Sequence, residues 1–101
     1  MKPTMLLVGP MTGLPNYNRA AFLKAQEYFE AKGFHVINPG EAAPDLEDTD
    51  WHGYMRRSLH NLLGVNHIGL LPGWHKSQGA RLEVDVANAL NLLMWEDLLS
   101  A

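Results

Sequence analysis

The sequence has no cysteine among its 101 residues, so disulfide bonds, thiolate metal sites and a cysteine nucleophile are excluded. It also has no surplus of positive charge: the net charge is −3, which argues against binding to a nucleic-acid backbone. No apolar run approaches the ~20 residues that cross a bilayer, so no membrane partner is expected. The apolar run at the N-terminus carries one lysine and ends at once in Gly9-Pro10, unlike a signal peptide. We therefore expect a cytoplasmic protein.

The composition is that of a globular protein. Hydrophobic residues make up 47% of the chain and charged residues 19%, which differs from the composition of disordered proteins. A length of 101 residues allows one hydrophobic core. We expect a single domain over residues 1–101.

Short apolar runs alternate with stretches of helical periodicity. In chain order, the pattern predicts a strand over residues 4–8, a helix over 19–32, a strand over 34–38, a helix over 51–63, a strand over 65–71 and a helix that begins after residue 77. Asn18, Asp50 and Ser77 are the predicted N-caps of the three helices. Gly33 and Gly64 are the predicted stops of the first two.

The last predicted helix has apolar residues at helical spacing. Leu82, Val86 and Leu90 predict the stripe that faces the core, with small alanines beside it. Residues 92–95 (LLMW) fit either a fourth strand or the last turn of this helix, and no β-branched residue favours the strand.

Strands that alternate with helices predict an α/β fold in which a parallel sheet lies between helical layers. We expect a three-layer α/β/α sandwich with a flavodoxin-like strand order 2-1-3-4. In this order the ends of the first and third strands are neighbours at the point where ligands bind in open α/β sheets. The loops over residues 9–13 and 72–79 are therefore expected to face each other across one crevice.

Glu83 is the candidate catalytic residue in this arrangement. It follows Gly79 and Ala80 by four and three residues, and helical side chains lean over the preceding turn. We expect its carboxylate to stand over an open notch at the ligand end of the helix. The helix dipole and nearby amides are expected to keep it ionised near neutral pH.

No metal site or cofactor is predicted. The acidic segment over residues 40–49 lacks the glycine and the closing glutamate of a calcium-binding EF-hand loop. His52 and His60 are two helical turns apart, which is too far for a pair of zinc ligands.

The segments LLVGPMTGLPNYN, YMRRSL and LLPGWHKSQGARLE together resemble small phage and bacterial domains of the nucleoside 2-deoxyribosyltransferase superfamily. The resemblance covers nearly the whole chain. Among named enzymes, the deoxynucleoside monophosphate N-glycosidases are similar. It implies that Glu83 is the nucleophile that attacks the sugar, and that Ser77 with nearby amides holds the 5′-phosphate or hydroxyl. The substrate-binding residues expected from these motifs are Gly9, Pro10, Met11, Thr12, Gly13, Ser58, Gly73, Trp74, Ser77 and Gly79.

Three positions depart from the superfamily pattern. Ser58 stands where the superfamily has an assisting aspartate, Leu6 where the glycosidases have a tyrosine, and Thr12 where they have a phosphate-binding arginine. A serine hydroxyl cannot protonate the leaving base at neutral pH. Asp50 or one of the histidines at positions 52, 60 and 67 could replace the aspartate, and the sequence does not decide among them.

Two functions are therefore open. One is cleavage or transfer of the N-glycosidic bond of a deoxynucleoside or its monophosphate by Glu83. The other is a nucleotide-binding or catalytically degenerate domain of the same fold. The resemblance also implies a homodimer or larger assembly, which we expect to pack through the second and third helices near Trp51, Leu59 or Val86.

Overall fold

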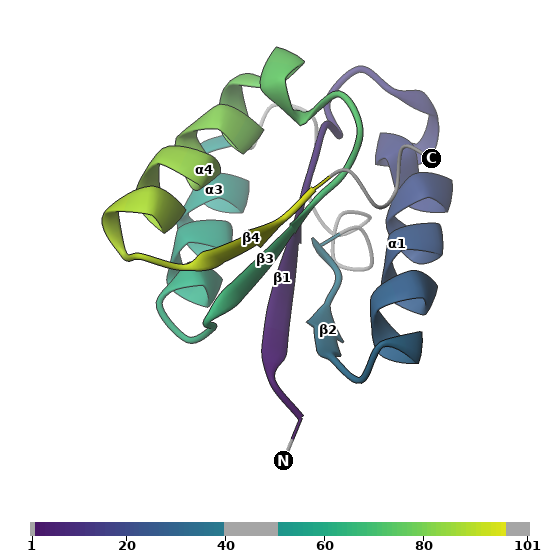
Figure 1. The fold of residues 1–101 in the computed structure, drawn as a ribbon. Helices are drawn as coiled ribbons and strands as arrows, with labels where there is room; N and C mark the ends of the chain where they lie inside the picture. Colours follow the sequence, from purple (N-terminus) through teal and green to yellow (C-terminus); the bar gives the residue numbers. More distant parts are fainter. Residues whose placement is uncertain (1, 40–50, 97–101) are drawn as a thin grey trace.

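A computed structural model describes residues 2–39 and 51–96 of the chain, in which four strands and three α-helices form one layered domain (Figure 1). In chain order the elements are β1 (Thr4–Val8), the 3₁₀ turn η1 (Pro15–Asn18), α1 (Arg19–Ala31), β2 (His35–Ile37), α3 (Trp51–Leu62), β3 (His67–Leu70), the 3₁₀ turn η3 (Trp74–Lys76), α4 (Gln78–Ala89) and β4 (Leu93–Trp95).

The four strands form one parallel sheet in the order β2-β1-β3-β4, which confirms the predicted fold class and strand order. Residues 93–95, which the sequence left open, form the edge strand beside β3. Asn91, with φ 59°, takes the left-handed conformation that ends the preceding helix, and this turn returns the chain to the sheet.

Helices cover both faces of the sheet, with α1 on one face and α3 and α4 on the other (Figure 1). The alternation of β1 explains this layering, because neighbouring residues of a strand point to opposite faces. Met5 and Leu7 belong to the core under α1, which includes Phe22 and Phe29. Leu6 belongs to the core that contains residues of α3 and α4.

Gly69 in the middle of β3 allows α1 to approach the sheet closely. A Cβ atom at this position would lie 2.8 Å from Met5 Sδ and 2.8 Å from Phe29 Cε2. The sheet therefore has no room for a side chain beneath the ring of Phe29.

The predicted core stripe of α4 is wrong at Leu82 and Leu90, whereas Val86 packs against the core. Leu82 and Leu90 are 39% and 41% exposed, whereas Ala80, Val84 and Ala87 are buried. The helix is apolar on two sides, so helical periodicity alone does not select the side that faces the core. The side with the small residues is buried because α3 and the sheet lie close to it.

Asn18 directly precedes α1, as predicted, but its side chain does not cap the helix. This residue has φ 63° and its side chain makes no cap hydrogen bond to α1. Its Nδ2 donates to the carbonyl oxygen of Pro10 at 3.0 Å, because η1 turns the side chain back toward the first loop. Asn18 thus fixes the loop after β1.

The acidic segment 40–49 and the N-cap predicted at Asp50 lie outside the described residues.

Candidate active site

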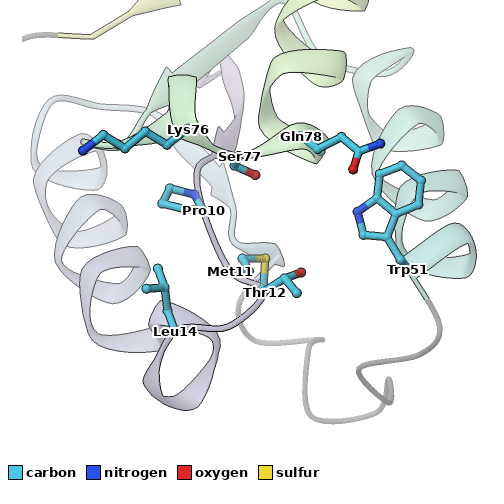
Figure 2. Close-up of a pocket in the computed structure, with 10 residues that line it drawn as sticks. Pro10, Met11, Thr12, Leu14, Trp51, Lys76, Ser77 and Gln78 are labelled. Carbon is cyan, nitrogen blue, oxygen red and sulfur yellow. The ribbon is translucent and has the colours of Figure 1, made fainter.

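A crevice of about 560 Å³ lies between the loop after β1 and the loop after β3, as the strand order predicts. The first turns of α3 and α4 complete its walls (Figure 2). Its lining residues are Pro10, Met11, Thr12, Leu14, Trp51, Gly73, Lys76, Ser77, Gln78 and Gly79. The predicted meeting of the two loops in one crevice is confirmed.

The two ends of the crevice differ in chemistry. Trp51 and Gln78 lie at one end, whereas Lys76 and Leu14 lie at the other (Figure 2). Lys76 is the charged side chain among the lining residues. The amino end of α4 adds a partial positive charge and backbone N–H groups. A ligand with a flat apolar part and an anionic part would be complementary to this lining.

Ser77 is the N-cap of α4, as predicted. Its Oγ accepts a hydrogen bond from the backbone N–H of Ala80 at 3.2 Å. Gly73 begins η3 with φ 84°, a conformation that favours glycine. The loop therefore has a defined path from β3 into the helix, and Ser77 still lines the crevice.

Glu83 does not stand over an open notch. Its side chain is 1% exposed, and its Oε2 accepts a hydrogen bond from the hydroxyl of Ser58, which is 2% exposed. A Cβ at Gly79 would lie 3.1 Å from Met55 Sδ and 3.4 Å from Trp51 Nε1. The notch that the sequence predicts therefore exists, but side chains of α3 fill it.

Helices α3 and α4 lie side by side and run in the same direction. The first turn of α3 meets the first turn of α4, where Trp51 lies beside Gly79. One to two turns further along, Ser58 meets Glu83. Because four helical residues span ~6 Å, the hydrogen-bonded pair lies about one turn deeper than the wall of the crevice.

Burial raises the pKa of Glu83 to about 7, and the hydrogen bond from Ser58 lowers it only in part. The expectation that this carboxyl is fully ionised at neutral pH is therefore not met: with a pKa of about 7 it is about half ionised there, because of the cost of desolvation. Burial and the nearby Glu83 carboxylate also raise the pKa of Tyr54. Tyr54 precedes Ser58 by one helical turn, and both are close to Glu83.

A second, smaller cavity of about 70 Å³ lies on the opposite side of Ser58 from α4. Its lining residues are Ile37, Asn38, Pro39, Tyr54, Arg57, Ser58 and Asn61. Its volume is about that of two water molecules. Ser58 thus lies between Glu83 and this cavity at the end of β2.

Several predicted binding residues lie outside the crevice lining. Gly9 packs against Leu71, the residue after β3, since a Cβ at position 9 would be 2.7 Å from Leu71 Cβ. Gly13 is exposed in the turn with φ 81°. Trp74 packs against the core and its Nε1 donates to Glu96 Oε2 at 2.8 Å. Ser58 contacts Glu83 rather than the crevice.

The three histidines that could replace the superfamily aspartate, at positions 52, 60 and 67, line neither cavity, and the fourth candidate, Asp50, lies outside the described residues. His67 begins β3 and so lies at the amino end of the sheet, away from the crevice. Its Nδ1 accepts a hydrogen bond from Trp95 Nε1 at 3.1 Å. His52 and His60 are exposed, and neither lines either cavity.

Sequence reasoning missed two residues near Glu83. Trp51 was expected near a contact between subunits, although it lines the crevice. Tyr54 had no assigned role, although it precedes Ser58 by four residues and so shares its helical face. Helical spacing from Ser58 could have identified both, since residues 51, 54 and 58 lie on neighbouring parts of one face.

The described residues contain no group of three or more histidine, aspartate or glutamate side chains that could hold a metal ion. Within residues 2–39 and 51–96, no helix is both long enough and apolar enough to cross a membrane.

The model of a family described as a domain of unknown function, DUF4406, matches residues 3–95. The chain belongs to the DUF4406 family. No curated protein matches the sequence at a significant level. The match covers both loops of the crevice, the Ser58–Glu83 pair and all four strands, so the candidate site lies wholly within the DUF4406 domain.

Proposed function

We propose that this DUF4406 domain cleaves or transfers the N-glycosidic bond of a 2′-deoxynucleoside or its 5′-monophosphate, with Glu83 as the nucleophile. A carboxylate oxygen would attack C1′ of the sugar, and the base would leave with the electrons of the broken bond and take up a proton. Water or a second base would then attack C1′ and free the carboxylate. The carrying observation is a buried, hydrogen-bonded carboxyl one helical turn behind a ligand-sized crevice.

The lining of the crevice supports a nucleotide as the ligand. The amino end of α4 provides a partial positive charge and backbone N–H groups for a 5′-phosphate. The side chain of Lys76 extends away from Ser77 (Figure 2) and adds positive charge at the other end of the crevice. Pro10 and Met11 provide apolar surface for the sugar or the base. The resemblance of the GPMTG and GARLE segments to the nucleoside 2-deoxyribosyltransferase superfamily supports the same substrate class.

A nucleotide-binding domain without efficient chemistry is the second candidate. It is favoured by the 1% exposure of Glu83, because a nucleophile must reach its substrate. It is also favoured by the serine at position 58, since within the described residues neither a second carboxyl group nor a histidine is shown beside Glu83 to protonate the leaving base.

The two candidates differ in the release of free base. We expect the protein to liberate free base from at least one member of a panel of 2′-deoxynucleosides and their 5′-monophosphates, detected by chromatography. Release should increase as the pH rises through about 7, because the attacking carboxylate must be ionised. A panel in which ligands bind, by calorimetry, but no base appears would support the binding domain instead.

We also propose that two copies of the chain associate through the outer face of α4. Leu82 and Leu90 are exposed there, and Val86 between them is half-buried, so the face presents an apolar stripe. We expect light scattering at micromolar concentration to give the mass of a dimer or larger assembly, and the Leu82→Glu variant to give a monomer. Leu23→Glu is the matched control, because Leu23 is 48% exposed on α1 at the other face. A monomeric wild-type protein would contradict the proposal.

A further inference from the structure

Trp51 occupies the boundary between the crevice and Glu83. It lines the crevice, and its Nε1 lies 3.4 Å from the position that a Cβ of Gly79 would occupy. Glu83 is the next residue on this side of α4, one turn deeper, and its carboxylate accepts a hydrogen bond from Ser58. Nothing larger than hydrogen separates the indole from the helix at this point, because position 79 is glycine.

The neighbouring residues complete this closure. Met55, one turn after Trp51 on α3, lies with its Sδ 3.1 Å from the same position at Gly79. Two side chains of α3 thus fill the space that the glycine leaves, and Glu83 behind them is 1% exposed. Of the two, only Trp51 lines the crevice; Met55 is 4% exposed and belongs to the interior.

We infer that Trp51 shields Glu83 from the crevice. A ligand with a flat heterocyclic ring stacks on the indole and displaces the indole from Gly79, and the ligand thereby reaches the carboxylate. The shielding stands on geometry alone, whereas its importance for turnover rests on the proposed function. Trp51 is thus a positioning residue for the reaction, because it controls the approach of the sugar to Glu83.

Because of the position of Trp51, little free energy is needed to displace its side chain. It is the first residue of α3, and its side chain is half-buried rather than enclosed. The first N–H groups of a helix have no partner within the helix, so fewer hydrogen bonds hold the first turn than hold the turns inside the helix. An aromatic ring of the ligand would replace the contacts that the indole loses, since stacked aromatic pairs are favourable.

Chemical labelling of carboxyl groups tests the shielding without any turnover. The protein is treated with a water-soluble carbodiimide and glycine ethyl ester at pH 6, and modification of each carboxyl is followed by mass spectrometry. Asp85 is an internal reference, because it lies two residues further along α4 and is exposed. In the wild type we expect Glu83 to react roughly tenfold more slowly than Asp85 or slower still, as buried groups react only through local opening.

Three variants identify the residue responsible. We expect Trp51→Ala to raise the labelling rate of Glu83 about tenfold, whereas Trp51→Phe keeps a ring over Gly79 and should leave most of the protection. Leu14→Ala is the matched control, since Leu14 lines the crevice at the end away from Trp51. Equal Glu83 labelling in the wild type and Trp51→Ala, or equal effects of Trp51→Ala and Leu14→Ala, would overturn the inference.

Ligand probes test the displacement. We expect 2′-deoxyadenosine 5′-monophosphate to change tryptophan fluorescence in the Glu83→Gln protein and to lose this effect in the Glu83→Gln/Trp51→Ala protein. Deoxyribose 5-phosphate, which has no base, should change neither. A change that persists without Trp51 would overturn the inference. If Trp51 protects Glu83 from labelling but the protein releases no base, the proposed reaction is refuted and the shield is not. If the protein releases base at a rate that Trp51→Ala does not change, the shield alone is refuted.

Discussion

Replacing Glu83 by glutamine is expected to lower the rate of base release from a deoxynucleotide by about 10³-fold or more, to the background of the assay. Glutamine keeps the size of the side chain and can still accept a hydrogen bond from Ser58. It cannot form the covalent bond to C1′, because its amide oxygen carries no negative charge. The loss should appear in single-turnover measurements at saturating substrate, where binding does not limit the rate.

A matched control separates this chemical effect from a change in the helix. Asp85→Asn removes a carboxylate from the same helix, but Asp85 is exposed and two residues away from Glu83. We expect this variant to retain the wild-type rate. A Glu83→Gln protein that binds the deoxynucleotide and releases base at the wild-type rate would exclude Glu83 as the nucleophile.

Most of the fold could be predicted because its signals are local. The apolar run over residues 4–8, the glycine at position 33 and the serine at position 77 each determine the start or the end of an element through the chemistry of the residue itself. Once three strands alternate with helices, the handedness of the connections leaves few topologies. The sequence could therefore predict that two distant loops share one crevice.

The state of Glu83 could not be predicted in the same way. Its position after Gly79 is a local feature, and the sequence identified it. Its burial depends on how close α3 lies, and therefore on Trp51 and Met55, which are 28 or more residues earlier in the chain. The same distant contact determines which side of α4 is buried, so the stripe at Leu82 was misassigned for the same reason.

We expect the free energy of unfolding to depend on pH through the titration of the buried Glu83 carboxyl. The pKa of Glu83 rises from its ordinary value of 4.5 to about 7 in the folded protein. Between these two values the folded protein binds one proton more than the unfolded chain, so the free energy of unfolding falls as the pH rises. The stabilisation is fully present below pH 4.5 and is lost as the pH passes 7. Its total size is about 3 kcal/mol.

The comparison with Glu83→Gln isolates this contribution, since glutamine does not titrate and all other ionisable groups remain. We expect urea unfolding of the two proteins from pH 4 to pH 9 to show that the wild type loses stability relative to the variant across this interval and becomes parallel to it above pH 8. Ser58→Ala should extend the loss to higher pH, because the hydrogen bond from Ser58 lowers the pKa of Glu83. Curves for the wild type and Glu83→Gln that run parallel from pH 4 to pH 9 would mean that the carboxyl is solvated. In that case the shield at Trp51 and the upward shift of the Glu83 pKa would both be wrong.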